Sequence, residues 1–320
     1  MVCSTDTEWC YRYRAADVSK RKETVSLAEL AHFYASSQFY IHCFYQGSLE
    51  VIRLKRILNY FRSIPSRWKL IWPLAKNDFK SRYATSQLGM FWAFFRPIVM
   101  ACVYIFVFAV IARAAPVGGI YPYSLWMLPG LIVWFVFSES IASGVNTLTE
   151  YSYLVKNIRF NISILPDVKV VAAFIIHVFF VALIIVIYLL NGLPIKLNII
   201  QLPYYMIATF YFTLAFTRIV CTAQPFFKDL SVAIEIILMV GIWACPIMWD
   251  LGVLPSEYHL IFKANPLYHL VTGYRECYMG DTWFWNHPIS FCEFWVITIL
   301  LDLWGRRMFR RLSSQFADVI

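Results

Sequence analysis

Long apolar runs separated by short polar segments fill the chain from residue 90 onward. A helix needs about 20 apolar residues, at ~1.5 Å rise each, to cross a bilayer core. Such runs recur near 90–112, 122–143, 168–190, 203–224, 231–249 and 287–305. Each is expected to be helical, because lipid offers the backbone no hydrogen-bond partners. The pattern predicts an all-α integral membrane protein with six transmembrane helices.

Positive charge lies mainly on one side of these predicted spans. With the N-terminus inside, the inner segments hold seventeen Lys and Arg residues, nine of them in 51–82 and four in the "RRMFRR" tail. The outer segments hold four, which are Arg113, Lys196, Lys263 and Arg275. Cytoplasmic loops carry the excess of Lys and Arg, so both termini are expected to be cytoplasmic.

The segment 51–82 precedes the first span and carries a different pattern. Apolar residues recur there with a period close to 3.6, and cations fill the other face. This predicts an amphipathic helix in the cytoplasmic headgroup layer, kinked or broken at Pro65 and Pro73. An amphipathic helix packed on protein is the alternative, and the density of cations favours lipid.

A second amphipathic segment lies between the second and third predicted spans. Thr147-x-x-Glu150 has the spacing of a capping box at a helix start. One face of a short helix is then shared by Leu148, Tyr151, Leu154, Val155 and Ile158. That face can bury itself against the bundle or against a partner, and the residues alone leave both possibilities open.

Two short helices are predicted between the fifth and sixth spans, near 255–263 and 266–278. Pro255 and Pro266 each suit a first helical turn, and Gly280 ends the second helix. Neither helix is long enough to span. They are expected to be re-entrant or interfacial helices on the outer face.

The composition agrees with a membrane protein. Of 320 residues, 60% are hydrophobic and 15% are charged, whereas about a quarter of a soluble domain is charged. Residues 1–30 are polar and charged, so no cleavable signal peptide is expected. The eight cysteines show no CxxC pair, so neither a disulfide framework nor a metal site is expected.

The sequence lacks the common catalytic motifs. HExxH, GxSxG and the P-loop are all missing, so no catalytic residues are assigned and no nucleotide hydrolysis is expected of this chain. Ionisable residues within the predicted spans are candidates for function. They are Arg96, Glu139, His177, Arg218, Glu235, Glu293 and Asp302. Of these, Arg218, Glu235 and Asp302 are expected to pair with one another or to snorkel.

The first predicted span is rich in aromatic residues. Trp92, Phe95 and Phe106 lie close to one helical face. Aromatic faces stack well against sugar rings. Ordinary helix packing is the alternative for any one of these side chains.

The order of these features resembles the membrane subunit of ATP-binding-cassette exporters for cell-surface polysaccharides, which export O-antigen, capsule and teichoic acid. The resemblance covers about 68–320. It is carried by "DFKSRYATSQLGMFWAFFRPIVM", "YPYSLWMLPGLIVWFVFSESIASGVNTLTEYSYLVKNIRF", "FFKDL" and "PIMWDLGVLPSEYHLIFKANPLYHLVTGYRECYMGDTWF". The "PIMWD" stretch is most similar to the teichoic-acid branch.

The resemblance implies a homodimer that forms one channel for a lipid-linked polysaccharide. Two copies of a separate cytoplasmic P-loop ATPase would drive it, with ATP and Mg bound there and no cofactor bound by this chain. The protein would sit in the bacterial cytoplasmic (inner) membrane and contact lipid but no nucleic acid. Residues 83–320 would be the permease domain.

The resemblance also implies roles for particular residues. The substrate would be loaded at Lys80, Arg82, Leu88, Gly89 and Arg96, where the cations would favour an anionic diphosphate. The channel would be lined by Trp92, Phe95, Tyr104 and Phe106. The ATPase would dock on Glu150, Tyr151, Leu154, Lys156 and Arg159. The outer gate would comprise Tyr258, Asn265, Tyr268, Tyr274 and Arg275.

Two features depart from the family. Many relatives carry Asn before the proline of the first span, where this chain has Arg96. Residues 1–50 match nothing in the family, so they are an added extension or an upstream misreading of the start, with translation beginning near Val51. The competing functions are export of a drug or small lipid, an intramembrane transferase, and a passive channel.

Overall fold

The structure is a computed structural model that describes residues 67–84, 86–113, 121–156, 160–193, 196–280 and 282–320. The predicted extension over 1–50, the start of the predicted interfacial helix and Pro65 lie outside the described residues. The described part is helical and contains no β-strand, as the hydrophobic pattern predicted.

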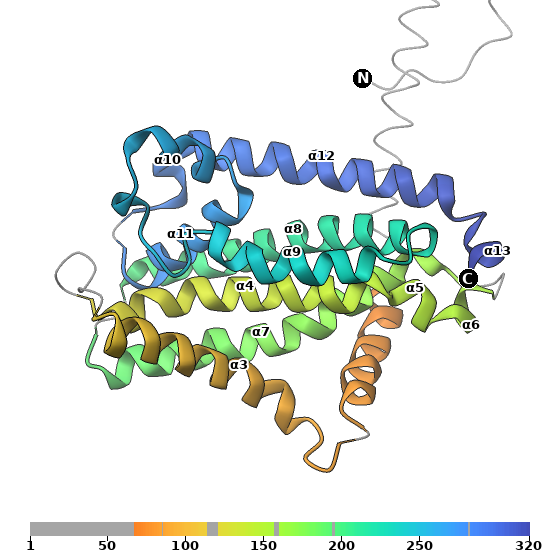
Figure 1. Cartoon of the computed structure of the whole chain (residues 1–320), viewed down its shortest axis with the longest axis horizontal. Helices are drawn as coiled ribbons and strands as arrows, with labels where there is room; N and C mark the ends of the chain where they lie inside the picture. Colours follow the sequence, from red (N-terminus) through yellow and green to blue (C-terminus); the bar gives the residue numbers. More distant parts are fainter. Residues whose placement is uncertain (1–66, 85, 114–120, 157–159, 194–195, 281) are drawn as a thin grey trace, which may run out of the picture. The chain divides into compact units, whose positions relative to one another are not determined.

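The described helices follow one another with short connections (Figure 1). A helix over 67–82 comes first. The longer helices that follow are α3 (Phe91–Ile105), α4 (Tyr123–Val145), α7 (Leu165–Leu190), α8 (Leu202–Ala223), α9 (Leu230–Ala244), α10 (Ser256–Lys263), α11 (Pro266–Tyr278) and α12 (Pro288–Leu312). The shorter ones are the π-helix η1 (Phe106–Ile111), α5 (Thr147–Glu150), α6 (Ser152–Val155), η2 (Ile162–Ile164), η3 (Leu197–Gln201), η4 (Gln224–Phe226), η5 (Leu251–Val253), η6 (Phe284–Asn286) and α13 (Phe316–Val319).

Five helical segments in the described part are long and apolar enough to cross a membrane. They are Phe91–Ile111, Tyr123–Val145, Ile162–Leu190, Leu197–Phe226 and Pro288–Leu312. Each matches one of the predicted spans, so five of the six are confirmed.

The fifth predicted span, 231–249, is shorter than expected. Its helix, α9, has 15 residues and is therefore about 22 Å long, against a hydrocarbon core of about 30 Å. Cys245 is extended, with ψ of 141°, because the residue before a proline disfavours helical geometry and Pro246 follows. The six-span count therefore stays a prediction.

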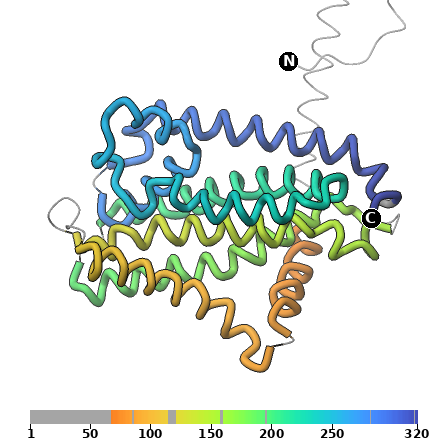
Figure 2. Tube along the Cα trace, in the orientation of Figure 1, coloured from red at the N-terminus to blue at the C-terminus, as the bar shows by residue number. Residues whose placement is uncertain are grey.

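Helix α4 forms the centre of the bundle. It is buried along most of its length and packs against α7, α8, α9 and α11. Helix α3 packs against α4 on one side of the bundle, whereas α12 packs against α8 on the opposite side (Figure 2). In α3 only Ala93 is buried, so the first span is the least enclosed of the long helices.

Small residues let neighbouring helices approach closely. A Cβ on Gly273 of α11 would overlap the ring of Tyr205 in α8, which is itself 1% exposed. A Cβ on Gly144 of α4 would overlap Thr217 of α8. Close approach through small residues is a common way for helices to associate within membranes.

The helix over 67–82 runs across the direction of the long helices (Figure 1). Its narrow face, Ile71, Ala75 and Phe79, is buried against α7. Trp68 and Trp72 remain nearly half exposed. The helix therefore has one face on protein and leaves an aromatic face free for lipid. It continues through Pro73 without a break, so of the two expected effects of Pro73 the break was wrong and the kink stays a prediction.

One end of the bundle carries α5, α6 and α13 (Figure 1). Leu148 and Val155, on the apolar face of these two short turns, pack with Phe309 and Phe316 from the C-terminal segment. Of the two possibilities left open above, burial against the bundle is therefore confirmed for Leu148 and Val155.

The predicted capping box at Thr147 was wrong. Asn146 occupies the N-cap position of α5. The Thr147 hydroxyl instead donates to the carbonyl oxygen of Gly144 at 2.7 Å, because Thr147 is already the first helical residue. Glu150 pairs with Lys169 rather than with the helix start.

The opposite end carries α10 and α11 (Figure 1). Both were predicted within two residues of their observed bounds. Pro266 begins α11, and the Asn265 side chain accepts a hydrogen bond from the Leu267 backbone N–H as its cap. Helix α11 is sunk into the bundle, whereas α10 buries none of its residues.

Candidate substrate groove and its charge network

A groove of about 410 Å³ lies between α3, α4, α7 and α9. Its walls are mostly apolar and aromatic, which is typical of sites for amphiphilic ligands. The aromatic residues that line it are Tyr83, Trp92, Tyr104, Trp134, Phe135, Phe180 and Trp243. At the α9 wall, a Cβ on Gly241 would lie 2.7 Å from the Trp134 ring, so Gly241 allows α9 to pack onto that ring.

The channel-lining residues predicted from the first span fall into three groups. Trp92 and Tyr104 line the groove. Phe95 lines an adjoining hollow of about 380 Å³ together with Trp92, and the Trp92 and Phe95 rings meet edge to face at 5.8 Å. Phe106 is 55% exposed and lines neither of these two hollows.

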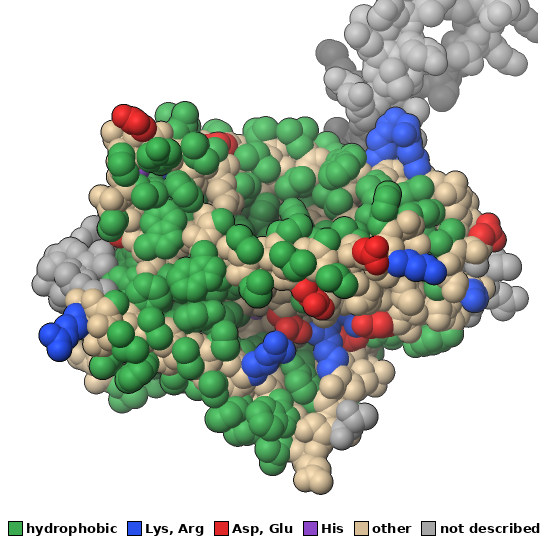
Figure 3. All heavy atoms as spheres, in the orientation of Figure 1, with side chains coloured by type: hydrophobic (Ala, Val, Ile, Leu, Met, Phe, Trp, Pro, Cys, Tyr) green, Lys and Arg blue, Asp and Glu red, His purple; other side chains and the backbone are tan. Residues whose placement is uncertain are grey.

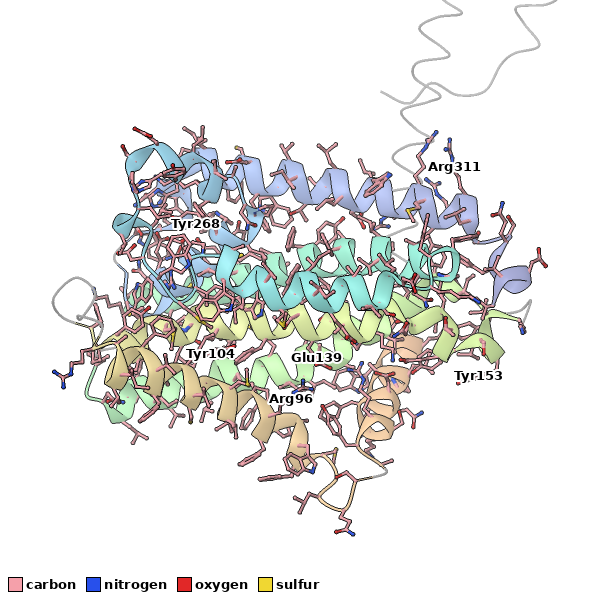
Figure 4. The ribbon with its side chains drawn as sticks, in the orientation of Figure 1. Arg96, Tyr104, Glu139, Tyr153, Tyr268 and Arg311 are labelled. Atoms are coloured by element: carbon pink, nitrogen blue, oxygen red, sulfur yellow. The ribbon has the colours of Figure 1, made fainter. Side chains whose placement is uncertain are left out.

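Three ionisable side chains reach the groove, namely Arg96, Glu139 and His177. His177 is buried, and its Nε2 lies 2.8 Å from the Tyr274 hydroxyl. Glu139 is paired with Arg82, with 2.7 Å between Oε1 and Nη1. Among the described residues Arg96 forms no ion pair. Figure 4 shows Arg96 on α3 and Glu139 on α4 in the same region of the molecule.

A network of ion pairs lies beside the groove, with Asp78 at its centre. The Asp78 carboxylate is 3% exposed. It accepts hydrogen bonds from Arg82 at 2.6 and 2.9 Å, from Lys169 at 2.7 Å and from the Tyr151 hydroxyl at 2.7 Å. Burial alone would raise the pKa of Asp78, but the neighbouring Arg82 and Lys169 hold it below its ordinary value.

The same network reaches the end of the bundle that carries α5. Lys169 of α7 also pairs with Glu150 of α5 at 2.5 Å. A continuous series of ion pairs therefore runs from Glu139 in the groove through Arg82, Asp78 and Lys169 to Glu150. It joins the helix over 67–82 to α4, α5 and α7.

A second cluster of ion pairs connects three of the long helices. Arg218 of α8 pairs with Asp302 of α12 and, at 3.0 Å, with Asp167 of α7. The expected pairing of Arg218 with Asp302 is confirmed. Glu235 is exposed on α9 and forms no ion pair with any described residue, so the expected pairing is not found for Glu235.

The five predicted loading residues lie in different environments. Arg82 is held by Asp78 and Glu139, whereas Lys80 is exposed and lines neither hollow. Leu88 is 58% exposed. Gly89 has a φ of +54°, a left-handed conformation that favours glycine. Arg96 alone of the five lines the groove.

The predicted coupling residues also differ in exposure. Tyr151 and Leu154 are half-buried, while Lys156 is exposed. Glu150 is half exposed although it pairs with Lys169. Tyr153, which the sequence pattern did not single out, is 66% exposed. Arg159 lies outside the described residues.

The predicted outer-gate residues lie at the end that carries α10 and α11. Tyr258 is exposed on α10, and Tyr268 and Arg275 line a hollow of about 290 Å³. Arg275 also donates to the backbone oxygens of Trp126, Pro246 and Ile247 and stacks on the Trp126 ring. Asn265 caps α11, and Tyr274 is fully buried.

Sequence reasoning missed Asp78, Lys169 and Phe316. Asp78 and Lys169 are 91 positions apart and pair only after folding. One signal was available, because an acidic residue at position 78 falls on the apolar face of the amphipathic pattern, between Ala75 and Phe79. A charge on a buried face requires a partner.

Five membrane-length helical segments, three of which contribute to an aromatic groove, place this chain among the multi-pass membrane proteins. The sequence matches the family described as "ABC-2 type transporter" over residues 69–279. The chain therefore belongs to the ABC-2 type transporter family.

Two similar proteins are named O-antigen export system permease protein RfbA. The one from Klebsiella pneumoniae is 24% identical over 270 residues, covering 84% of this chain and 99% of that protein. The one from Myxococcus xanthus is 27% identical over 276 residues, covering 84% of this chain and 100% of that protein.

Proposed function

We propose that this chain is the permease subunit of an ATP-driven exporter that moves a lipid-linked polysaccharide across the bacterial cytoplasmic membrane. Its membership of the ABC-2 type transporter family and its similarity to two proteins named O-antigen export permeases support this proposal. O-antigen-like polymers are the first choice of cargo. A teichoic-acid-like polymer, suggested by the "PIMWD" stretch, remains a prediction.

The observation that carries the proposal is an aromatic groove beside an unenclosed first span. Exposed apolar residues on α3 include Val99 and Val103, and those on α9 include Met239 and Trp243. Figure 3 shows hydrophobic side chains spread over this face of the bundle. A second copy packed on the face would cover it and turn two grooves into one aromatic-lined path, in keeping with a homodimer.

ATP hydrolysis is assigned to a separate subunit. The exposed side of α5 and α6, with Tyr153 and Lys156, is proposed to contact a cytoplasmic P-loop ATPase subunit, and the two such subunits of the complex bind ATP and Mg. This chain is then a transport subunit without a nucleotide site. The end that carries α5, α6 and α13 faces the cytoplasm in this arrangement, and α10 and α11 face outward.

Loading is proposed at the turn between the helix over 67–82 and α3. Lys80 is exposed at the end of the first of these helices, and Gly89 supplies the left-handed turn that precedes the aromatic start of α3. The ion-pair series from Glu150 to Glu139 gives motion at the ATPase contact a physical route to the groove.

Depletion of this chain in its native host tests the cargo. The account predicts that depleted cells lose their surface polymer and accumulate the lipid-linked polymer on the cytoplasmic side. The accumulated polymer should be a protease-resistant glycan that antibodies reach only after the cells are permeabilised. Re-expression of the wild-type chain should restore the surface polymer. Normal surface polymer after complete depletion would contradict the proposed function.

A further inference from the structure

Arg96 occupies a position where an unpaired charge is costly. It lies on α3, which begins the membrane-length segment Phe91–Ile111, five residues after the helix begins. A cation on such a helix requires water, an anion or a partner side chain. The acidic residue that lines the groove with Arg96 is Glu139, and Arg82 already pairs with it at 2.7 Å. The groove therefore carries a net positive charge at Arg96.

The surroundings of Arg96 are aromatic. Tyr83, Trp92 and Phe95 line the adjoining hollow together with Arg96. All three can present ring faces or edges to a ligand, and the Tyr83 hydroxyl can donate a hydrogen bond. Burial raises the pKa of Tyr83, Glu139 raises it further, and Arg82 and Arg96 oppose that rise. Tyr83 thus lies within the electrostatic reach of Arg96 and stays a neutral donor.

We propose that Arg96, with Tyr83, Trp92 and Phe95, forms an anion-binding site at the groove that receives a phosphate or carboxylate group of the exported amphiphile. The guanidinium offers two parallel N–H donors to such a group. The rings bind the apolar or sugar portion next to it. This inference rests on the proposed function, and it places the anion on α3 rather than on Arg82, each of whose three nitrogens already donates to a carboxylate.

Arg82 has a different role in this arrangement. Its contacts with Asp78 and Glu139 remove the negative charge of Glu139 from the groove. An unpaired carboxylate there would repel the anion or bind Arg96 itself. Arg82 therefore acts as a positioning residue that keeps Arg96 available.

The experiment uses the full chain with its co-purified ATPase in phosphatidylcholine nanodiscs. Binding of farnesyl diphosphate, farnesol and a glucuronic acid tetrasaccharide is measured by thermophoresis. We expect Arg96→Gln to weaken binding of an anionic probe at least tenfold and to leave farnesol binding unchanged. Arg96→Lys, which keeps the charge but loses the paired donors, should weaken the same probe two- to fivefold.

The control variant is Arg113→Gln, which removes another exposed arginine from the end of the same span without touching the groove. It should bind all three probes as the wild type does. A loss confined to farnesyl diphosphate assigns the site to the lipid-borne phosphate. A loss confined to the tetrasaccharide assigns it to an acidic sugar of the polymer.

The inference would be overturned if the Arg96→Gln variant bound both anionic probes as tightly as the wild type does. It would also be overturned if the wild-type protein bound neither anionic probe. If Arg96→Gln fails to assemble, the Arg96→Lys variant decides on the same criterion. These results are separate from the proposed function. An exporter that retains its ATPase and surface polymer while Arg96→Gln binds normally would refute only the Arg96 site.

Discussion

Asp78 binds the buried Lys169, the half-buried Arg82 and a tyrosine hydroxyl, so its loss should be costly. In Asp78→Asn, Arg82 and Lys169 lose their shared carboxylate, and breaking a buried ion pair typically costs ~3 kcal/mol or more. We predict a clear fall in the thermal unfolding midpoint of the detergent-purified protein. Asp229→Asn, at an exposed acid that caps α9 without a side-chain hydrogen bond, is the matched control and should unfold as the wild type does.

The difference in stability between the wild type and Asp78→Asn should depend on pH in a defined way. The native pKa of Asp78 lies below its ordinary value, which is about 3.9 in unfolded chains. Its contribution to the free energy of unfolding is therefore fully present above about pH 4 and is lost as pH falls through the native pKa. The gap between wild type and Asp78→Asn should stay constant from about pH 5 to 8. A gap that shrinks within that range would show that another group dominates.

Gly273 tests the packing of α11 into the bundle. In Gly273→Ala the new Cβ overlaps the fully buried ring of Tyr205, so either the ring or α11 must shift. Overpacking of this kind usually costs ~1–3 kcal/mol. We predict a lower unfolding midpoint than in Gly252→Ala, where the nearest atom to the new Cβ is 3.8 Å away. Equal midpoints would mean that α11 is less tightly held than the structure indicates.

Sequence patterns predicted the aromatic groove residues better than the ionic ones. Trp92 and Tyr104 were found because aromatic side chains recur along one apolar span. Arg82 was read as a free cation because its two acidic partners are on the same helix and on α4, 57 residues away. Only tertiary structure shows that each of its three nitrogens already donates to a carboxylate.

The two faces of α5 and α6 should respond differently to substitution. Leu148 is fully buried, whereas Tyr153 is 66% exposed. Leu148→Ala should destabilise the purified chain by ~2–5 kcal/mol. Tyr153→Ala should leave its unfolding midpoint unchanged but reduce ATPase recovery in a pull-down. Normal ATPase recovery with Tyr153→Ala would move the docking surface away from these turns.

The length of the apolar runs predicted the membrane spans reliably. Local sequence signals predicted the ends of the helices less well. Five spans follow from the need to satisfy the backbone in lipid, which no tertiary contact alters. The end of α9 depended on Pro246, a signal present in the sequence but outweighed by the apolar run around it. The capping box failed because α4 ends so close to α5 that the Thr147 hydroxyl bonds back to Gly144.

The whole molecule combines a well-packed centre with an unenclosed side. Helix α4 is buried by its neighbours, while α3 and α9 expose apolar residues next to the groove. One copy therefore holds a lateral groove, and a closed path requires a second copy on that face. This arrangement is the physical basis of the proposed homodimer, and it agrees with membership of the ABC-2 type transporter family.

Native mass spectrometry of the tagged chain, purified in mild detergent from its host, tests the central claim most directly. The account predicts a complex of two copies of this chain with two copies of a P-loop ATPase. The Arg113→Gln variant should give the same complex. A monomer, or a dimer without any ATPase under conditions that preserve the dimer, would contradict the account.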